Sequence, residues 1–359
     1  MPTFSSPLIN WQREHGRNDL PWQGTDPYRV WLSEIMLQQT QVATVIPYYL
    51  RFVASFPDIE ALANASEEEV LAHWSGLGYY ARGRNLHRAA RMIMELHGGQ
   101  FPQQYEQILS LPGIGRSTAA AICALGFHEK RAILDGNVKR VLARYCGIVG
   151  HHSTKQVDEE LWRQAELLLP DNDVAVYTQA LMDMGAMLCT RCRPKCESCP
   201  VQEDCIAFQA GIVNELPTSK QRKIVPERSA IFLLAMSDGK ILLEKRKSSG
   251  IWGGLWCLPQ FDEEDDVQNW CALHGIEPDK LIRHPSELGE SADSIAQCKA
   301  LVSFAHIFTH FKLHITPLLL YLAHKPLHQA EHVWLSVDQA LQAAIPTPVR
   351  QLLSRLANV

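Results

Sequence analysis

The sequence predicts two domains of different class, an all-α domain followed by a smaller α+β domain. The chain has 359 residues, which is more than one ordinary domain holds. Residues 1–210 contain long segments of helical periodicity, and β-branched alternation is scarce in them. Beyond residue 229, short apolar runs typical of strands accompany two helical stretches. This change of pattern places a linker between the two domains.

The composition is that of a globular protein, with 46% hydrophobic and 20% charged residues. It excludes a chain that is disordered, collagenous or a coiled coil over its whole length. No apolar run approaches the roughly 18–20 residues of a membrane span, and the first residues lack the pattern of a secretory signal. We therefore expect a cytoplasmic protein with no membrane partner. The net charge of −5 does not by itself indicate a nucleic-acid-binding protein.

Periodicity also predicts the individual elements. Helical segments of the first domain, residues 1–212, are expected at 28–50, 57–73, 84–97, 104–126, 137–146, 157–168 and 174–188. Residues 213–228 are polar, contain Pro217 and Pro226, and are expected to form the linker. In the second domain, 229–359, we expect strands at 231–235, 241–243, 315–322 and 333–335 and helices at 267–273 and 337–344.

Basic residues gather in three short stretches despite the negative net charge. Local patches of this kind can bind phosphate, although solvated helix faces explain each stretch about equally well. The stretches are Arg82, Arg84, Arg88 and Arg91, then Lys139, Arg140 and Arg144, and then Arg191, Arg193 and Lys195.

The helix expected at 28–50 is apolar over most of its circumference, as a buried helix is. Glu34, Gln38 and Gln41 are its polar exceptions. A carboxylate on such a helix must be hydrogen-bonded or line a cleft, and burial would raise its pKa toward the range of a general acid. Taken alone, Glu34 is more simply explained as a cap of a neighbouring helix.

A tight turn with the sequence Leu-Pro-Gly-Ile-Gly joins two helical segments at residues 111–115. Its glycines, Gly113 and Gly115, permit positive φ and close approach of another backbone. The turn presents free N–H groups at the start of the next helix, where they can grip a phosphate without reading bases. An ordinary helix–helix connection is the alternative.

Asp135 precedes the helix expected at 137–146, beside Gly136 and Asn137. An aspartate at such a position is most often an N-cap. The same N–H groups would keep it ionised, as the stabilisation of a developing cation requires. A protonated Glu34 and an ionised Asp135 would form the split carboxyl pair that cleaves glycosidic bonds.

Ten cysteines in a chain without an export signal indicate metal or redox chemistry rather than disulfides. Four of them, at 189, 196, 199 and 205, are separated by six, two and five residues. Tetrahedral thiolate sites hold zinc or iron–sulfur clusters, and this spacing is not that of a zinc ribbon. Cys192 forms a CxxC pair with Cys189, so zinc or a redox disulfide stays open.

Five motifs in this order resemble the adenine DNA glycosylases of the MutY type, which belong to the helix-hairpin-helix superfamily with endonuclease III. They are WLSEIMLQQTQV, GLGYYARGRNL, LPGIGRSTA, ILDGNVKRVLAR and the cysteine cluster at 189–205. The similarity extends from about Leu20 to Cys205 and continues more weakly to the C-terminus. It implies removal of adenine mispaired with 8-oxoguanine or guanine in double-stranded DNA, which leaves an abasic site for base excision repair.

The resemblance also implies a role for each matching residue. Glu34 matches the general acid, Asp135 the residue that stabilises the oxocarbenium ion, and Asn137 its helper. Trp22 and Gln179 fall at the adenine pocket, while Gln39 and Tyr79 match the residues that wedge into the stack during base flipping. Further DNA contacts are expected at Gly113, Gly115, Ser117, Lys139, Arg140 and Arg191. Cys189, Cys196, Cys199 and Cys205 match the ligands of a 4Fe–4S cluster, and a monovalent cation is implied at the hairpin.

Ser117 departs from the pattern of the enzymes in this superfamily that also nick the strand. Those enzymes carry a lysine two residues after the last hairpin glycine, and a Schiff base needs that amine. We therefore expect a monofunctional glycosylase. The Ser117 hydroxyl is free to touch the reacting sugar instead.

The second domain is similar to the Nudix-like domain of this family, which recognises the 8-oxoguanine strand. Phe308, Thr309 and His310 match the lesion-recognition loop, with threonine where serine is usual, and His306 and His314 are expected on an ordinary strand face. The catalytic Nudix pattern lacks its arginine, so pyrophosphate hydrolysis is not expected. The acidic residues Glu263, Glu264, Asp265 and Asp266 are expected in a solvated turn.

Three other functions compete with this interpretation. An endonuclease III-like glycosylase/lyase explains only the first domain, and a Nudix hydrolase explains only the second. A non-catalytic Fe–S protein that binds DNA has no need of both Glu34 and Asp135. The expected partner is DNA with 8-oxoguanine:adenine or guanine:adenine mispairs at the bacterial nucleoid, and the linker is a candidate contact for replication or repair proteins.

Overall fold

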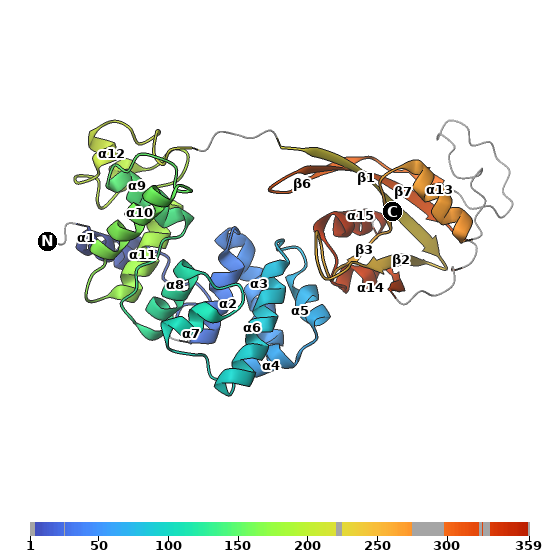
Figure 1. Cartoon of the computed structure of the whole chain (residues 1–359), viewed down its shortest axis with the longest axis horizontal. Coiled ribbons are helices and arrows are strands. Elements are labelled where there is room, and N and C mark those ends of the chain that lie inside the picture. Colours follow the sequence, from blue (N-terminus) through green and yellow to red (C-terminus); the bar gives the residue numbers. More distant parts are fainter. Residues whose placement is uncertain are drawn as a thin grey trace. The chain divides into compact units, whose positions relative to one another are not determined.

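The computed structural model describes residues 4–24, 26–219, 225–274, 298–322, 325 and 331–357 (Figure 1). The chain divides into two compact units. The first comprises Met1–Ala65 and Ala81–Arg222, and the second comprises Ser66–Tyr80 and Lys223–Val359. Helix α5 (Glu67–Trp74) therefore belongs to the second unit, although it lies among the helices of the first in sequence.

The first unit is built from helices in the part of the chain that the structure describes, as the sequence predicts. They are α1 (Ser5–His15), α2 (Pro27–Leu37), α3 (Val42–Ser55), α4 (Ile59–Asn64), α6 (Ala81–His97), α7 (Tyr105–Ser110), α8 (Arg116–Phe127), α9 (Gly136–Tyr145), α10 (Lys155–Leu167), α11 (Val174–Met187) and α12 (Ile206–Gln209), with a 3₁₀ turn at Cys196–Ser198. Helix α1 is not among the predicted segments. Because α1 packs on α11, its buried residues Leu8 and Ile9 belong to one core with Val138, Leu142 and Leu181.

The prediction of one helix at 28–50 is wrong. Helix α2 ends at Leu37 and α3 begins at Val42, so Gln38 and Gln41 are cap residues rather than members of one helix face. Gln39 between them has a φ of 58°, in the left-handed region that a right-handed helix cannot accommodate. The segment 57–73 is also interrupted, because Ser66 starts α5 with a capping box to Glu69.

The second unit contains one mixed sheet, and its predicted α+β class is confirmed. Its strands are β1 (Glu227–Ser237), β2 (Lys240–Lys245), β3 (Trp256–Cys257), β4 (Gln260–Phe261), β5 (Cys298–Ala300), β6 (Phe304–Ile307), β7 (Lys312–Tyr321) and β8 (His332–Ser336). The central order is β3-β2-β1-β7-β5, while β4 pairs with β1, β6 with β7, and β8 with β2. Strands β1 and β7 are parallel, with Glu227 opposite Lys312 and Met236 opposite Tyr321.

Helices α13 (Glu264–Leu273), α14 (Val337–Gln342) and α15 (Thr347–Ala357) complete this unit. Side chains alternate along β1, so that Leu233 packs in one core with Trp270 of α13, while Phe232 and Leu234 are buried on the opposite face. The acidic residues 263–266 are exposed, as expected, but they form the start of α13 rather than a turn. No helix in the described ranges is long and apolar enough to cross a membrane.

Candidate active site and cysteine cluster

Glu34 is held by a buried helix. Asp26 caps α2 by accepting a hydrogen bond from the Tyr28 N–H at 3.0 Å, and Pro27 begins the helix. The neighbouring side chains Trp31 and Leu32 are fully buried, and Glu34 is only partly exposed among them. This helix is therefore a rigid, largely apolar support for one carboxyl group.

The environment of Glu34 favours its protonated form. Burial, with an added effect from the negative charge of Asp135, raises the pKa of Glu34 to about 8. A carboxyl group with this pKa holds its proton at neutral pH and can release it to a reacting group. The effect of Asp135 also places the two carboxyl groups within electrostatic reach of one another, although they come from helices far apart in the sequence.

Asp135 is the N-cap of α9, and its Oδ1 accepts a hydrogen bond from the Val138 N–H at 2.7 Å. Burial raises the pKa of Asp135, which is opposite to the direction expected from its place at a helix N-terminus. The N–H groups of Val138 and Asn137 and the charges of Arg140 and Lys139 act against burial and lower the pKa. Of the two carboxyl groups, Glu34 is therefore the one that stays protonated, because backbone N–H donors stabilise the ionised form of Asp135.

Ser117 and Asn137 support the backbone around Asp135. The Leu134 N–H donates to the Ser117 Oγ at 2.9 Å, so this hydroxyl accepts a hydrogen bond from the residue before Asp135. The Asn137 Oδ1 accepts from Arg140 at 2.9 Å. A Cβ on Gly185 would lie 2.6 Å from the Asn137 Cβ, so only glycine lets α11 approach α9 this closely.

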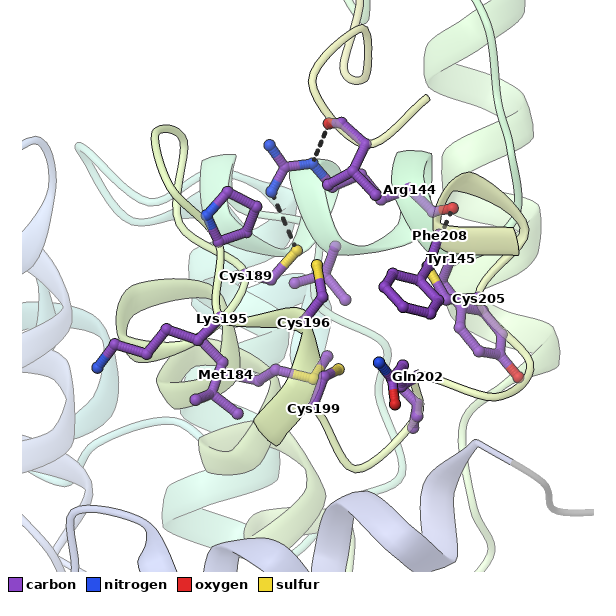
Figure 2. A pocket seen from close by; sticks show the side chains of 15 residues that line it. Arg144, Tyr145, Met184, Cys189, Lys195, Cys196, Cys199, Gln202, Cys205 and Phe208 are labelled. Carbon is purple, nitrogen blue, oxygen red and sulfur yellow. Dashed lines mark hydrogen bonds between the residues drawn. The ribbon is translucent and has the colours of Figure 1, made fainter. Parts of the chain in front are cut away.

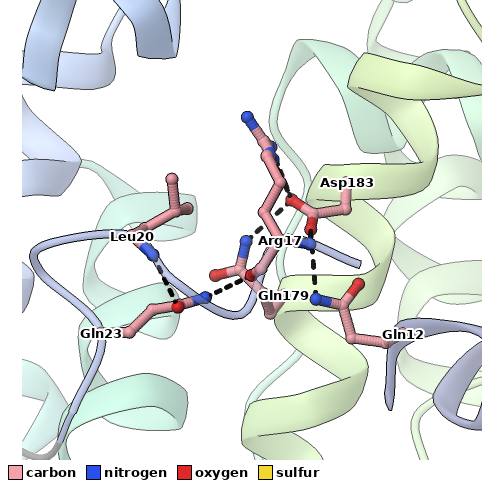
Figure 3. Close-up of polar contacts among 6 residues, drawn as sticks. All are labelled: Gln12, Arg17, Leu20, Gln23, Gln179 and Asp183. Carbon is pink, nitrogen blue, oxygen red and sulfur yellow. Dashed lines mark hydrogen bonds and ion pairs between the residues drawn. The ribbon is translucent and has the colours of Figure 1, made fainter. Parts of the chain in front are cut away.

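The predicted pocket residue Gln179 belongs to a polar network that the sequence did not reveal (Figure 3). Its centre is Asp183, whose side chain is fully buried. Gln179 donates to the Asp183 Oδ1 at 2.8 Å, Arg17 donates to the same oxygen through its Nε at 2.9 Å, and Gln12 donates to Oδ2 at 3.1 Å. A full shell of donors explains how α11 tolerates a buried carboxylate.

The same network holds the loop that leads to Trp22. The Arg17 backbone N–H donates to Asp183 at 2.7 Å, and the Gln23 side chain bonds the Arg17 carbonyl at 2.6 Å and the Leu20 N–H at 3.0 Å. Trp22 itself is buried, and it contacts the Tyr49 ring edge-on, with the ring centroids 5.3 Å apart. The sequence gives no sign that Arg17 and Asp183 pair, because residues so far apart in the chain are linked by no spacing rule.

The hairpin lies where the sequence predicts it, between α7 and α8. Gly113 has a φ of +83°, and a Cβ there would come within 2.9 Å of the Asn85 Cβ. Gly115 is the N-cap of α8 and provides no side-chain cap. The Gln38 side chain approaches the Gly113 carbonyl and the Thr118 hydroxyl at 3.5 Å each, which links the end of α2 to the hairpin.

Both predicted wedge residues have left-handed backbones. Gln39 has a φ of 58° and Tyr79 a φ of 48°, values that are uncommon for residues other than glycine. The Tyr79 side chain is 44% exposed, and Gln39 is also exposed. Strained backbone of this kind is often found at functional sites.

Several of the predicted basic residues form internal contacts. Arg82 is buried and donates to the Ile35 and Met36 carbonyls at 3.0 and 2.8 Å. Arg140 donates to the Cys189 carbonyl at 2.7 Å, and Lys139 pairs with Asp158 at 2.6 Å. Neither interpretation of its basic stretch, a phosphate-binding patch or a solvated helix face, describes Arg82, because its guanidinium is buried and completes the carbonyl end of α2. Arg191, in contrast, is exposed.

The four predicted cysteine ligands line one cavity (Figure 2). Apolar side chains, including Val141, Met184 and Leu188, form the rest of its wall. Burial raises the pKa of the Cys199 thiol to about 11 and also raises the pKa of Cys196 and Cys205. In the described ranges no group of three His, Cys, Asp or Glu side chains is placed to hold a single metal ion.

Arg144 places a positive charge beside this cavity. It is buried, and it donates to the Cys189 Sγ at 3.3 Å (Figure 2). It also donates to the Thr190 carbonyl at 2.8 Å. A solvated helix face, one of the two interpretations of its basic stretch, is therefore wrong for Arg144. If the thiols were ionised, their negative charge would lower the cost of burying this guanidinium. Cys192 is exposed and lies outside the cavity lining.

The lesion-loop residues of the second unit adjoin an aromatic cluster. Phe308 stacks on Phe311 with ring centroids 4.4 Å apart, and it also contacts Trp252 at 5.4 Å. Thr309 and His310 are exposed, and their side chains approach one another at 3.4 Å. His314 is paired with Glu227 at 2.6 Å on the strand, in agreement with the expectation that it is an ordinary strand-face residue.

Comparison with known proteins gives matches for both units. Residues 32–166 match the family described as HhH-GPD superfamily base excision DNA repair protein, and residues 230–355 match the NUDIX domain family. An adenine DNA glycosylase of Buchnera aphidicola (strain APS) is 36% identical over 98% of this chain and 96% of its own. An adenine DNA glycosylase of Mus musculus is 32% identical over 97% of this chain and 77% of its own.

Among solved structures, a thermostable thymine-DNA glycosylase is similar to the helical part of the chain. It has a TM-score of 0.53 and 30% sequence identity, and the match covers 58% of this chain and 95% of that one. The structural similarity and the sequence relatives thus agree on the class of the helical unit.

Proposed function

Because this chain belongs to the adenine DNA glycosylase family and is a DNA N-glycosylase of base excision repair, we propose that it excises adenine mispaired with 8-oxoguanine or guanine. The product is an abasic site. We assign the chemistry to the domain at 1–212 and recognition of the lesion strand to the domain at 229–359, with residues 213–228 as the linker; residues 220–224 of that linker lie outside the described part.

The observation that carries the chemical part of this proposal is the pKa of about 8 at Glu34 beside the charge of Asp135. Glu34 donates its proton to a ring nitrogen of the flipped adenine. The bond between that base and C1′ of the sugar breaks, and its electron pair leaves with adenine. Asp135 stabilises the positive charge on the sugar, assisted by Asn137, and water attacks C1′ to complete the reaction.

Ser117 supports a monofunctional enzyme. Its hydroxyl accepts a hydrogen bond from the Leu134 N–H, and it provides no amine for a Schiff base with the sugar. This accepted bond positions the backbone that leads to Asp135, and it leaves the O–H of Ser117 able to donate to the reacting sugar.

For the cysteine cavity we propose a 4Fe–4S cluster held by Cys189, Cys196, Cys199 and Cys205. Four thiols around one largely apolar cavity, with the Arg144 guanidinium against the Cys189 sulfur, support this assignment. Bound there, the cluster would fix the loop at 189–205. Arg140 donates to the Cys189 carbonyl, so the same loop is tied to the helix that begins after Asp135.

The DNA contacts complete the proposal. Gly113 and Gly115 of the hairpin present N–H groups to a phosphate, and the exposed Arg191 adds charge. A monovalent cation, if bound, would be held by carbonyl oxygens of the hairpin and would supply further positive charge near the phosphate. Gln39 and Tyr79 fill the gap left by the flipped base, Trp22 and Gln179 line the adenine pocket, and Phe308, Thr309 and His310 contact the lesion. We place this activity on bacterial chromosomal DNA, with replication or repair proteins as candidate linker partners.

A single-turnover assay on duplexes with one 8-oxoguanine:adenine pair tests the proposal. Strand scission is measured with and without alkaline treatment. Cleavage of the adenine strand only after alkali is the expected result. Scission without alkali would support a glycosylase/lyase, and retention of binding without any abasic product would contradict the catalytic assignment.

A further inference from the structure

The segment Ser66–Tyr80, which we call the docked segment, belongs to the same compact unit as the C-terminal domain. Its flanking residues Ala65 and Ala81 belong to the helical unit. The segment consists of α5 and the loop that carries Tyr79. Two polar anchors and a buried apolar surface attach it to the C-terminal domain.

The first anchor is Glu68, near the start of α5. Its carboxylate accepts from the Lys245 Nζ and from the Trp256 Nε1, each at 2.6 Å. The Lys245 ammonium also lies 5.0 Å from the centre of the Trp256 ring. Although burial acts in the opposite direction, these two donors hold the pKa of Glu68 below its usual value. The ionised carboxylate therefore joins α5 to both β2 and β3.

The second anchor is Ser75, just after α5. Its hydroxyl donates to the Ile345 carbonyl at 2.6 Å and accepts from Arg350 at 2.9 Å. The Tyr80 hydroxyl bonds the same carbonyl at 3.3 Å. Ile345 is fully buried between α14 and α15, so this anchor reaches the interior of the C-terminal domain.

Between the two anchors, α5 carries buried apolar side chains. Val70, Leu71 and Trp74 of α5 are fully buried. A Cβ on Gly254, where φ is +77°, would lie 3.6 Å from the Leu71 side chain, so Leu71 lies close to the turn that carries Gly254. A helix of this length is marginal by itself, so its conformation depends on this packing.

Tyr79 lies between Ser75 and Tyr80, on a loop with little conformational freedom. The Trp74 indole N–H donates to the Gly78 carbonyl at 3.2 Å, and Gly76 and Gly78 both have positive φ. Tyr79 shares the positive φ yet remains 44% exposed. The C-terminal domain thus holds the loop on both sides of an exposed tyrosine.

We propose that Glu68 and Ser75 are positioning residues that fix Tyr79 on the same compact unit as Phe308, Thr309 and His310. This inference rests on the proposed function, in which Tyr79 enters the stack and Phe308 contacts the lesion. Discrimination between 8-oxoguanine:adenine and guanine:adenine then depends on the anchors, because they fix the spacing between the residue that opens the stack and the residues that contact the lesion.

The test exchanges the charges of Glu68 and Lys245 and combines this with a double-mutant cycle that includes Tyr79→Ala. Glu68→Lys and Lys245→Glu are compared singly and together, by the ratio of single-turnover rates on the two mispairs. Each single variant is expected to lower this ratio about tenfold, since each breaks a partly buried pair. The double variant is expected to recover part of the loss, because it restores the ion pair but not the Trp256 hydrogen bond. Glu60→Lys, at an exposed position of α4, is the matched control.

The Tyr79→Ala background separates positioning from general stability. If Glu68 acts through Tyr79, Glu68→Lys will have no further effect on the ratio in that background. Ser75→Ala, which removes one hydroxyl, is expected to show the same dependence and guards against misfolding of the charge variants. An equal loss with and without Tyr79, or an unchanged ratio in every anchor variant, would overturn the inference. A wild-type chain that releases no adenine would instead refute the proposed function.

Discussion

The helical unit and the sheet unit differ in what surrounds their proposed functional residues. In the helical unit, carboxyl groups are drawn inside: Asp183 is fully buried with a shell of donors, and burial raises the pKa of both Glu34 and Asp135. In the sheet unit, the acidic residues at the start of α13 are exposed, and aromatic rings gather instead around Phe308. Perturbed carboxyls suit bond cleavage, whereas aromatic surfaces suit contact with bases. This contrast supports our proposal that chemistry and recognition are divided between the units.

Glu34→Gln is expected to have the largest effect. Loss of the general acid should lower the single-turnover rate about 10²- to 10⁴-fold, while affinity for the mispair is kept because the amide has nearly the same shape. Rates and dissociation constants on one 8-oxoguanine:adenine duplex measure this. Glu60→Gln, an exposed carboxylate in α4, is the control. A variant that loses affinity in proportion to rate would show that Glu34 binds rather than reacts.

Asp183→Asn tests the buried carboxylate as a structural element. Removal of its charge leaves the Arg17 guanidinium without its ion pair, so the helical unit should lose about 3–5 kcal/mol of stability. Urea unfolding followed by the signal of the helical unit measures the loss. The control is Asp171→Asn, which breaks a surface pair with Lys130 and should cost about 1 kcal/mol or less. Equal losses would mean that burial of Asp183 has no energetic consequence.

The activity should depend on pH in a direction set by the two carboxyls. Glu34 must be protonated, so the rate should fall as pH rises through about 8, its pKa. Asp135 must be ionised, so the rate should also fall as pH decreases, and its raised pKa moves this limb upward from the range of an ordinary aspartate. Single-turnover rates measured from pH 5 to pH 9 give the profile. A flat profile would contradict the division of roles within the pair.

Phe308→Ala should have the smallest effect on the rate, and that effect should be confined to the 8-oxoguanine:adenine mispair. Loss of the ring should reduce the preference for 8-oxoguanine:adenine about tenfold, as expected for one stacking contact, with little change on guanine:adenine. Ile307→Ala, its exposed neighbour, is the control. A loss of rate on both mispairs alike would indicate that Phe308 supports the fold.

Much of this arrangement could be predicted from the sequence, and the failures have physical causes. Hydrophobic periodicity located most helices of the first unit and the strands β1, β2, β7 and β8, whereas α1, α12, α15 and β3 to β6 were not predicted. The hairpin turn was located from its glycines, and the four cysteines from their spacing. The break at Gln39 was missed because glutamine gives no signal for a left-handed conformation. Arg82 and Arg144 were assigned to the surface because a sequence does not show which carbonyls or thiols compensate a buried guanidinium. The Asp183 network and the docking of α5 join residues distant in sequence, which local patterns cannot reveal.

The most direct test of the division between the units is the ratio of single-turnover rates on 8-oxoguanine:adenine and guanine:adenine, measured for Glu34→Gln and Phe308→Ala. We predict that Glu34→Gln lowers both rates equally and leaves the ratio unchanged, whereas Phe308→Ala lowers the ratio and nearly preserves the rate on guanine:adenine. A changed ratio in Glu34→Gln together with an unchanged ratio in Phe308→Ala would contradict this account.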